Sequence, residues 1–332
     1  MAELTLLVPA LRERLRDAAR AVQPEGTALV RELARADVRI TAWPGIERAI
    51  IGLFAPTPDT VAGVAGLSAA HDFASETGSA GWLRADPVYL HADATRIVMR
   101  DASTLHLEPS EAAALVGELN AAFAHEGVTF RCGQAPTRWY VQPAAADAPA
   151  IESPRDMHGH TIERQLGALR ESGIWQRRLT VAQLVLHQSA VNRARVARGV
   201  PPVNSVWWWG GGPPARFTAR PHVHAFGVDH LLESCCRAVG AQSPHSIAAV
   251  ASSLSGELDT GAQLVLADIG PCELADFIHV IWRPALAALV ERRLTRIVLR
   301  VRGVEWCVTR ATRRRWWRRP ARVMSVLETT PA

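Results

Sequence analysis

Residues 203–214 read VNSVWWWGGGPP, and this stretch decides how we interpret the fold. Its β-branched and aromatic first half, which ends at Trp209, predicts a buried strand. The glycines Gly210, Gly211 and Gly212 follow at once, and two prolines come after them. Ligands of open α/β sheets bind at the carboxyl ends of strands, where glycines let the backbone approach a ligand closely. The end of this strand is therefore the first candidate site.

A structural turn is the alternative interpretation of the same stretch. A run of three glycines does not match the spacing of a phosphate-binding loop. In this alternative the glycines only supply positive φ angles, and the tryptophans belong to the core. Both interpretations stay open at this point.

Predicted helices and buried strands alternate on both sides of the tryptophan strand. Strands are expected over 4–9, 263–267, 297–301 and 305–309, and helices over 12–21, 42–54, 180–198, 229–239 and 272–293. Pro284 lies inside the last of these helices, where we expect a kink. The alternation is typical of a mostly parallel α/β sheet, and we place the tryptophan strand in that sheet.

A different pattern precedes the tryptophan strand. Short strands are expected over 88–91, 96–99, 128–132 and 138–142, around one helix over 111–125 that Ser110 caps. This pattern predicts a small α+β domain over 82–142, inserted into the α/β fold. The core would then be discontinuous, formed by 1–81 and 161–332, with 143–160 as a linker. Residues 55–81 give little periodic signal.

The composition limits the class of protein. All 37 basic residues among the 332 are arginines, and the formal net charge is +5. This bias comes with abundant alanine and fits a GC-rich coding sequence, so the charge alone does not indicate a polyanionic partner. No apolar run approaches the ~20 residues of a membrane span, and the N-terminus does not resemble a secretory signal. Five scattered cysteines indicate reduced thiols. We expect a cytoplasmic protein without a transmembrane segment.

One local charge cluster stands out, RRRWWRRPAR at 313–322. Arginines interleaved with tryptophans suit phosphates and stacked bases, or a lipid headgroup interface. The alternative is a solvated edge strand whose tryptophans cover the core, since charged edges protect sheets from aggregation.

Two stretches resemble a known family. They read LRADPVYLHADATRIVMRDASTLHLEPSEAAALVGELNAAF (83–123) and HQSAVNRARVARGVPPVNSVWWWGGGPP (187–214). Both are similar to a family of proteobacterial proteins that are described as RpfE-type regulatory proteins or as cofactor-independent phosphoglycerate mutases. More distantly, the layout resembles the archaeal-type cofactor-independent phosphoglycerate mutases. That resemblance implies an alkaline-phosphatase-like core that carries an inserted small α+β domain.

Departures from the mutase pattern bear on the chemistry. The resemblance implies, for an active enzyme, two divalent metals, a serine nucleophile, an Asp-Gly pair after the first strand and Asp-His pairs near the C-terminus. Here the first strand ends in Val8 and Pro9. Asp268 follows a later strand without a histidine in its loop, and Arg302 and Gly303 stand where an Asp-His motif is expected. We therefore expect no metal and no cofactor, with manganese or zinc only if the enzyme hypothesis holds.

A polar constellation around the glycine run is the remaining candidate. Gln188, Asn192 and Arg195 share a face of the helix expected over 180–198 because of their i, i+4 and i+3 spacing. Guanidinium and amide groups suit a phosphate or carboxylate ligand. The ligand-binding candidates are Arg84, Asp86, His91, Arg138, Trp139, His187, Gln188, Asn192, Arg195, Asn204, Trp209, Gly210, Gly211 and Gly212. The alternative is a hydrogen-bonded network that fixes two lobes and binds nothing. No catalytic residue is assigned.

Three functions follow from these observations. The first is a catalytically inactive phosphoglycerate-mutase-like protein with a regulatory or ligand-sensing role in the cytosol, whose partner is a phosphorylated or carboxylate small molecule or a protein. The second is an active metal-dependent phosphoglycerate mutase or another phosphoryl-transfer enzyme. The third is an adaptor that uses 313–322 on a membrane surface or on nucleic acid, of which nucleic acid is the less favoured partner.

Overall fold

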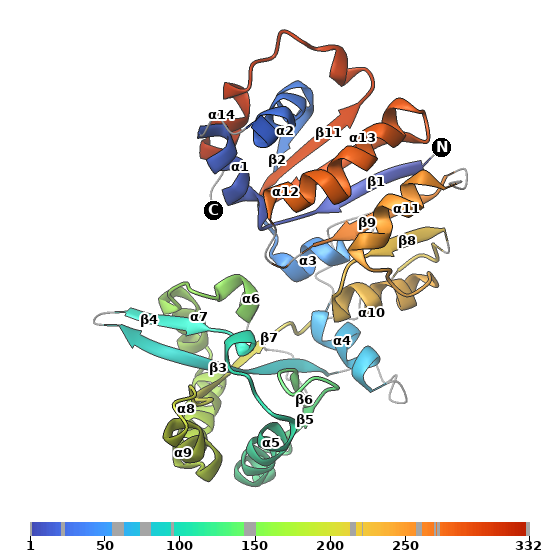
Figure 1. The fold of residues 1–332 in the computed structure, drawn as a ribbon. Coiled ribbons are helices and arrows are strands. Elements are labelled where there is room, and N and C mark those ends of the chain that lie inside the picture. The colour runs from blue at the N-terminus through green and yellow to red at the C-terminus, as the bar shows by residue number, and fades with distance from the viewer. Residues whose placement is uncertain are drawn as a thin grey trace. The chain divides into compact units, whose positions relative to one another are not determined.

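Two units make up the chain in the computed structural model (Figure 1). The described residues are 2–20, 24–54, 63–73, 81–93, 96–142, 151–212, 217–220, 222–256, 261–268, 270 and 273–329. The first unit is Met1–Pro56 with Phe217–Ala332, and the second is Thr57–Arg216. This division differs from the expected one, in which the insertion covered only 82–142.

A six-stranded, mostly parallel sheet forms the centre of the first unit. Its strands are β1 (Ala2–Leu7), β2 (Asp37–Ile40), β8 (Val223–Phe226), β9 (Gln263–Ala267), β10 (Leu294–Val301) and β11 (Val304–Thr309). β1 pairs in parallel with β9 and β10, and β9 pairs in parallel with β8. β11 and β2 extend one edge in antiparallel fashion, which makes the order β2-β11-β10-β1-β9-β8. The mostly parallel α/β sheet predicted from the sequence is present.

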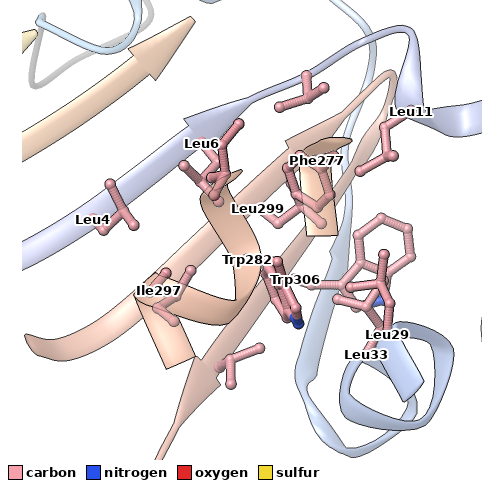
Figure 2. Close-up of a cluster of buried hydrophobic side chains, with 14 of the residues drawn as sticks. Leu4, Leu6, Leu11, Leu29, Leu33, Phe277, Trp282, Ile297, Leu299 and Trp306 are labelled. Carbon is pink, nitrogen blue, oxygen red and sulfur yellow. The ribbon is translucent and has the colours of Figure 1, made fainter. Parts of the chain in front are cut away.

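Helices of the first unit cover this sheet. They are α1 (Leu11–Arg20), α2 (Pro24–Arg35), α3 (Ile46–Ile51), α10 (His230–Val239), η3 (Ile247–Ala249), α11 (Val250–Ser255), α12 (Leu274–Asp276), η4 (Phe277–Trp282), α13 (Arg283–Val290), η5 (Thr312–Arg314) and α14 (Ala321–Thr329). Leu4 and Leu6 share one face of β1, because alternate residues of a strand point the same way. They belong to a buried cluster with Leu29 and Leu33 of α2 and with Trp282 (Figure 2).

The helix predicted over 272–293 consists of several segments. Residues Phe277–Trp282 form a π-helical turn between α12 and α13, and Pro284 stands at the start of α13. Proline lacks the N–H of a regular helix and clashes with the carbonyl four residues earlier, and the wider π turn relieves that conflict. The disturbance expected at Pro284 is therefore a π segment that precedes it.

An antiparallel sheet forms the centre of the second unit. Its strands are β3 (Leu83–Asp93), β4 (Arg96–Arg100), β5 (Thr129–Cys132), β6 (Trp139–Gln142) and β7 (Ser205–Trp209). They run in the order β4-β3-β6-β5, and β7 pairs with β3. The helices of this unit are α4 (Val64–Asp72), η1 (Ala102–Thr104), α5 (Pro109–Phe123), η2 (Ala124–Glu126), α6 (Pro154–Met157), α7 (Glu163–Glu171), α8 (Gly173–Gln188) and α9 (Ala190–Ala197).

The tryptophan strand β7 lies in this second sheet, so its predicted place in the parallel core is wrong. β7 pairs antiparallel with β3, with Trp209 opposite Arg84 and Ser205 opposite Val88. All five residues of β7 are buried, as the apolar run predicted. A buried strand has the same apolar pattern in either sheet, so periodicity does not identify its partner.

Local corrections concern how three helices begin. Glu108, rather than Ser110, caps α5 and shares a reciprocal capping box with Glu111. The helix predicted over 180–198 breaks at Ser189, whose hydroxyl accepts from the N–H of Val191 at 3.1 Å and starts α9. The helix predicted over 42–54 begins only at Ile46.

None of the helices within the described ranges combines the length and the apolar character needed to cross a membrane.

Candidate functional site

The pairing of β3 with β7 assembles the centre of the candidate site. Arg84 and Asp86 are two residues apart on β3 and therefore share one face of the strand. Trp209 lies opposite Arg84 in the register of the two strands. The side chains of all three residues are almost completely buried, with 3% of Arg84 and 5% of Asp86 exposed. The site is thus a charged cluster inside the second unit.

Arg84 and Asp86 form a bidentate ion pair. Nε of Arg84 donates to Oδ1 of Asp86 at 3.0 Å, and Nη2 donates to both carboxylate oxygens at 2.8 Å. Two further donors reach the carboxylate, the indole Nε1 of Trp209 at 2.8 Å and the backbone N–H of Trp139 at 3.2 Å. Desolvation raises the pKa of Asp86, and the attraction of the Arg84 guanidinium opposes that rise.

Aromatic rings enclose the guanidinium of Arg84. Its Cζ lies 5.1 Å from the ring centroids of both Tyr140 and Trp209, which is cation–π distance. Nη1 of Arg84 is buried and has no hydrogen-bond acceptor among the described residues. One N–H-bearing atom of this cation is therefore unused by the acceptors of the part of the chain that the structure describes.

The glycine run lies against the start of α4. Gly210 has a φ of +73°, a conformation that favours glycine. Its carbonyl accepts from the N–H of Ala65 at 2.8 Å, in the first turn of α4. A Cβ at Gly210 would lie 3.4 Å from the Ala65 nitrogen and 3.6 Å from Cγ of Arg84. Gly63, which precedes α4, supplies no side-chain cap, and the Gly210 carbonyl is an acceptor at the positive end of this helix instead.

A second ion pair adjoins the first through Tyr140. Nε and Nη2 of Arg138 donate to the two carboxylate oxygens of Asp72 at 2.9 and 2.5 Å. The Tyr140 hydroxyl donates to Oδ2 of Asp72 at 2.7 Å. Burial alone would raise the pKa of Asp72, but the hydrogen bonds from Arg138 and Tyr140 outweigh it and hold that pKa below its ordinary value. Burial also raises the pKa of the Tyr140 hydroxyl, which stays protonated and donates.

Two members of this cluster were missed in the sequence. Asp72 lies at the end of α4, within the stretch 55–81 whose small residues give little periodicity. Tyr140 follows the candidate Trp139 on β6. It lies two residues after Arg138, so the two side chains share one face of the strand, and this spacing could have identified Tyr140. Trp139 itself contributes a backbone N–H to Asp86, while its indole donates to the Pro136 carbonyl at 2.8 Å.

Three polar candidates hold chain segments together at other places in the second unit. Asn192 bonds the Leu186 and Val203 carbonyls, both at 2.7 Å. Arg195 is fully buried and bonds Glu111 and the backbone carbonyls of Leu105 and Pro201. Asn204 bonds both backbone groups of Leu90, at 2.8 and 2.9 Å. These contacts are structural.

The remaining candidates do not join the buried cluster. His91, His187 and Gln188 are exposed. The break at Ser189 places Gln188 in α8 and Asn192 in α9, so the shared helix face predicted for them is wrong. Gly211 and Gly212 continue the loop after Gly210, with a φ of +137° at Gly212.

The residues that follow β1 and β10 in the first unit, Val8 and Arg302, are not metal-ligand types. Val8 follows β1, is buried and donates its N–H to the Arg300 carbonyl at 3.0 Å. Nη1 of Arg12 donates to the Arg302 carbonyl at 3.1 Å, where β10 turns into β11. Among the residues that the structure describes, no three His, Cys, Asp or Glu side chains gather as a metal-binding group.

Comparison with known proteins shows a fold likeness. No family model and no curated protein matches the chain. The solved structure of the PH0037 protein from Pyrococcus horikoshii is similar at 13% identity and a TM-score of 0.53, over 99% of this chain and 98% of that chain. A cofactor-independent phosphoglycerate mutase from Thermoplasma acidophilum aligns at 14% identity with a TM-score of 0.45, over the same shares. At such identities the first likeness concerns the fold, and a shared fold does not carry an activity with it.

Proposed function

We propose that this chain is a cytosolic, phosphoglycerate-mutase-like protein that does not catalyse the mutase reaction. In this proposal the first unit is an alkaline-phosphatase-like core and the second is the unit inserted into it. Its role is regulatory or ligand-sensing, as in the RpfE-type proteins that its sequence resembles. The ligand is a phosphorylated or carboxylate small molecule.

The observation that carries this proposal is the mutual neutralisation of the charges in the candidate site. Asp86 accepts from Arg84, Trp209 and Trp139. Asp72 accepts from Arg138 and Tyr140. A carboxylate that acts as metal ligand or general base needs a lone pair directed at the metal or at the substrate. The lone pairs of Asp86 and Asp72 accept hydrogen bonds from the protein itself, which supports a binding or scaffolding role.

The position of Arg12, near the strand ends of the first unit, also supports a role without metal-dependent catalysis. Arg12 is 1% exposed and lies beside Arg16 and Arg302, and desolvation followed by repulsion from Arg16 lowers its pKa. Its two Nη atoms donate to the Arg302 and Leu327 carbonyls, so this cation bonds the protein's own chain. A guanidinium group supplies no ligand for a divalent cation.

The ligand position that we favour is the Gly210 loop. Nη1 of Arg84, which has no acceptor among the described residues, and the first turn of α4 are groups that attract an anion. Gly210 lies beside both, since its carbonyl accepts from the N–H of Ala65 and a Cβ at this position would lie 3.6 Å from Cγ of Arg84.

Metal analysis together with a mutase assay tests the proposal. The full chain is purified without chelator, and its manganese and zinc are measured by mass spectrometry. Conversion of 3-phosphoglycerate is then followed with and without added Mn²⁺. We expect substoichiometric metal and no turnover, together with a rise in melting temperature on adding 3-phosphoglycerate or inorganic phosphate. Stoichiometric metal with turnover would overturn the proposal.

An active phosphoryl-transfer enzyme is the second candidate, and one observation favours it. Asp229 and His230 follow β8, while Asp268 follows the neighbouring strand β9. Carboxylate and imidazole groups at adjacent strand ends are the ligand types that Mn²⁺ or Zn²⁺ accepts. Asp229 caps α10 by accepting from the N–H groups of Leu231 and Leu232. The same metal analysis decides between the two candidates.

A further inference from the structure

Two exposed tryptophans distinguish the segment between η5 and α14. Of the eleven tryptophans in the chain, eight are buried, while Trp316 is 79% and Trp317 62% exposed. Their rings form an edge-to-face pair with centroids 6.2 Å apart. Large aromatic side chains are costly to leave in water, and adjacent exposed ones mark an interaction surface.

The segment that carries these tryptophans is fixed to α2 and not part of an edge strand, contrary to the alternative drawn from the sequence. Arg313 pairs with Glu32 at 3.0 Å, and Arg315 pairs with Asp37. Arg318 donates to the Ala36 carbonyl at 2.8 Å. These three arginines bond carboxylate and carbonyl acceptors on α2 and just beyond its C-terminal end. The helix dipole is negative at that end, so cations are favoured there.

Other arginines of the segment keep their charges available. Arg314 and Arg319 are exposed, and neither side chain bonds a described residue. Arg310, just before the segment, is exposed in the same way. The surface formed by Arg314, Trp316, Trp317 and Arg319, which we call the Trp-Arg patch, is therefore both aromatic and cationic.

We propose that the Trp-Arg patch docks the protein onto an anionic lipid surface. Tryptophan rings favour the headgroup level of a bilayer, where one edge is apolar and the other is hydrated. Guanidinium groups beside them pair with lipid phosphates, and anionic lipids add attraction for each nearby arginine. This role is independent of the ligand proposed for the Gly210 loop.

Two other occupants fit the patch less well. Single-stranded nucleic acid needs a continuous cationic track with stacked bases. Most arginines that would form the track, among them Arg313, Arg315 and Arg318, bond the protein's own acceptors. A second copy of the chain would bring like charges together, because Arg314 and Arg319 of the patch have no neutralising partner among the described residues.

Vesicle sedimentation tests the docking. The full chain is mixed with vesicles of phosphatidylcholine alone and with vesicles that also contain phosphatidylglycerol. We expect binding only to the anionic vesicles, weakened by salt. Trp316→Ser/Trp317→Ser should abolish it, and Arg314→Ser/Arg319→Ser should weaken it about tenfold or more. Because these side chains are exposed, the variants should keep the wild-type melting temperature. The controls are Leu184→Ser, at a 56% exposed leucine, and Arg164→Ser/Arg177→Ser.

Tryptophan fluorescence gives a second readout on the unmodified protein. Trp316 and Trp317 are the most exposed tryptophans, so acrylamide quenches them preferentially. Anionic vesicles should protect this emission. Equal binding to neutral vesicles, or retained binding after the tryptophan substitutions, would overturn the proposal. So would patch-dependent binding of a single-stranded oligonucleotide or patch-dependent dimerisation without vesicle binding.

Discussion

Trp209 donates its indole N–H to Oδ2 of Asp86 at 2.8 Å, across 123 residues of chain. This bond joins the last residue of β7 to the long strand β3. It also links the glycine run to the buried ion pair of Arg84 and Asp86. The tryptophans are thus part of the framework that holds the charges, and the loop that follows them is positioned by that framework.

Removal of Asp86 should be strongly destabilising. Asp86→Ala leaves the Arg84 guanidinium buried and without its partner, so we expect a loss of about 3 kcal/mol in the free energy of unfolding. The double variant Arg84→Met/Asp86→Leu removes both charges and should lose less than the single variant. Urea denaturation followed by circular dichroism measures both values. A double variant less stable than Asp86→Ala would contradict this account of the pair.

Acid should remove the stability that Asp72 contributes. Its pKa in the folded protein is lowered, so its contribution is present above the unfolded value of about 3.9 and is lost as the pH falls through the folded value. Unfolding free energies measured from pH 7 to pH 2 should therefore fall more steeply below pH about 4 for the wild type than for Asp72→Asn. Asp17→Asn, at an exposed carboxylate, should follow the wild-type curve.

Gly210→Ala tests the ligand position with a matched control. Gly210 and Gly199 both have a φ of +73°, so an alanine at either position should cost about 1 kcal/mol of stability. A Cβ at Gly210 would face Ala65 and Arg84, whereas a Cβ at Gly199 would meet nothing within 4 Å. Calorimetric titration with inorganic phosphate should show weaker binding for Gly210→Ala and wild-type binding for Gly199→Ala. Equal affinities in the two variants would place the anion elsewhere.

Arg12 should hold the C-terminal helix α14 in place. Its Nη2 donates to the Leu327 carbonyl at 3.2 Å, and its Nη1 to the Arg302 carbonyl at 3.1 Å. Arg12→Met leaves these carbonyls without that donor and should cost about 2 kcal/mol. Hydrogen exchange should then accelerate first in α14. Arg14→Met, at a half-exposed arginine on the same helix, should leave the exchange of α14 unchanged.

Local patterns were sufficient to predict four of the six strands of the first unit, and β2 and β8 were missed. The strands expected over 4–9, 263–267, 297–301 and 305–309 correspond to β1, β9, β10 and β11. Apolar runs bounded by turn residues are local signals, because each residue reports its own burial. α4 was missed because its alanines, glycine and serine give little amphipathic contrast over 64–72.

In the candidate site, too, local sequence predicted some features and the tertiary structure decided the others. The local sequence alone identifies the tryptophan strand, its glycine run and the charged residues Arg84 and Asp86. The sheet to which that strand belongs, and the pairing of Arg138 with Asp72, depend on contacts between residues that are 66 or more positions apart. Such pairings are selected by the packing of whole elements against one another, which no short window of sequence contains. Whether a charged side chain is committed to the protein or available to a ligand is likewise decided only by its neighbours in space.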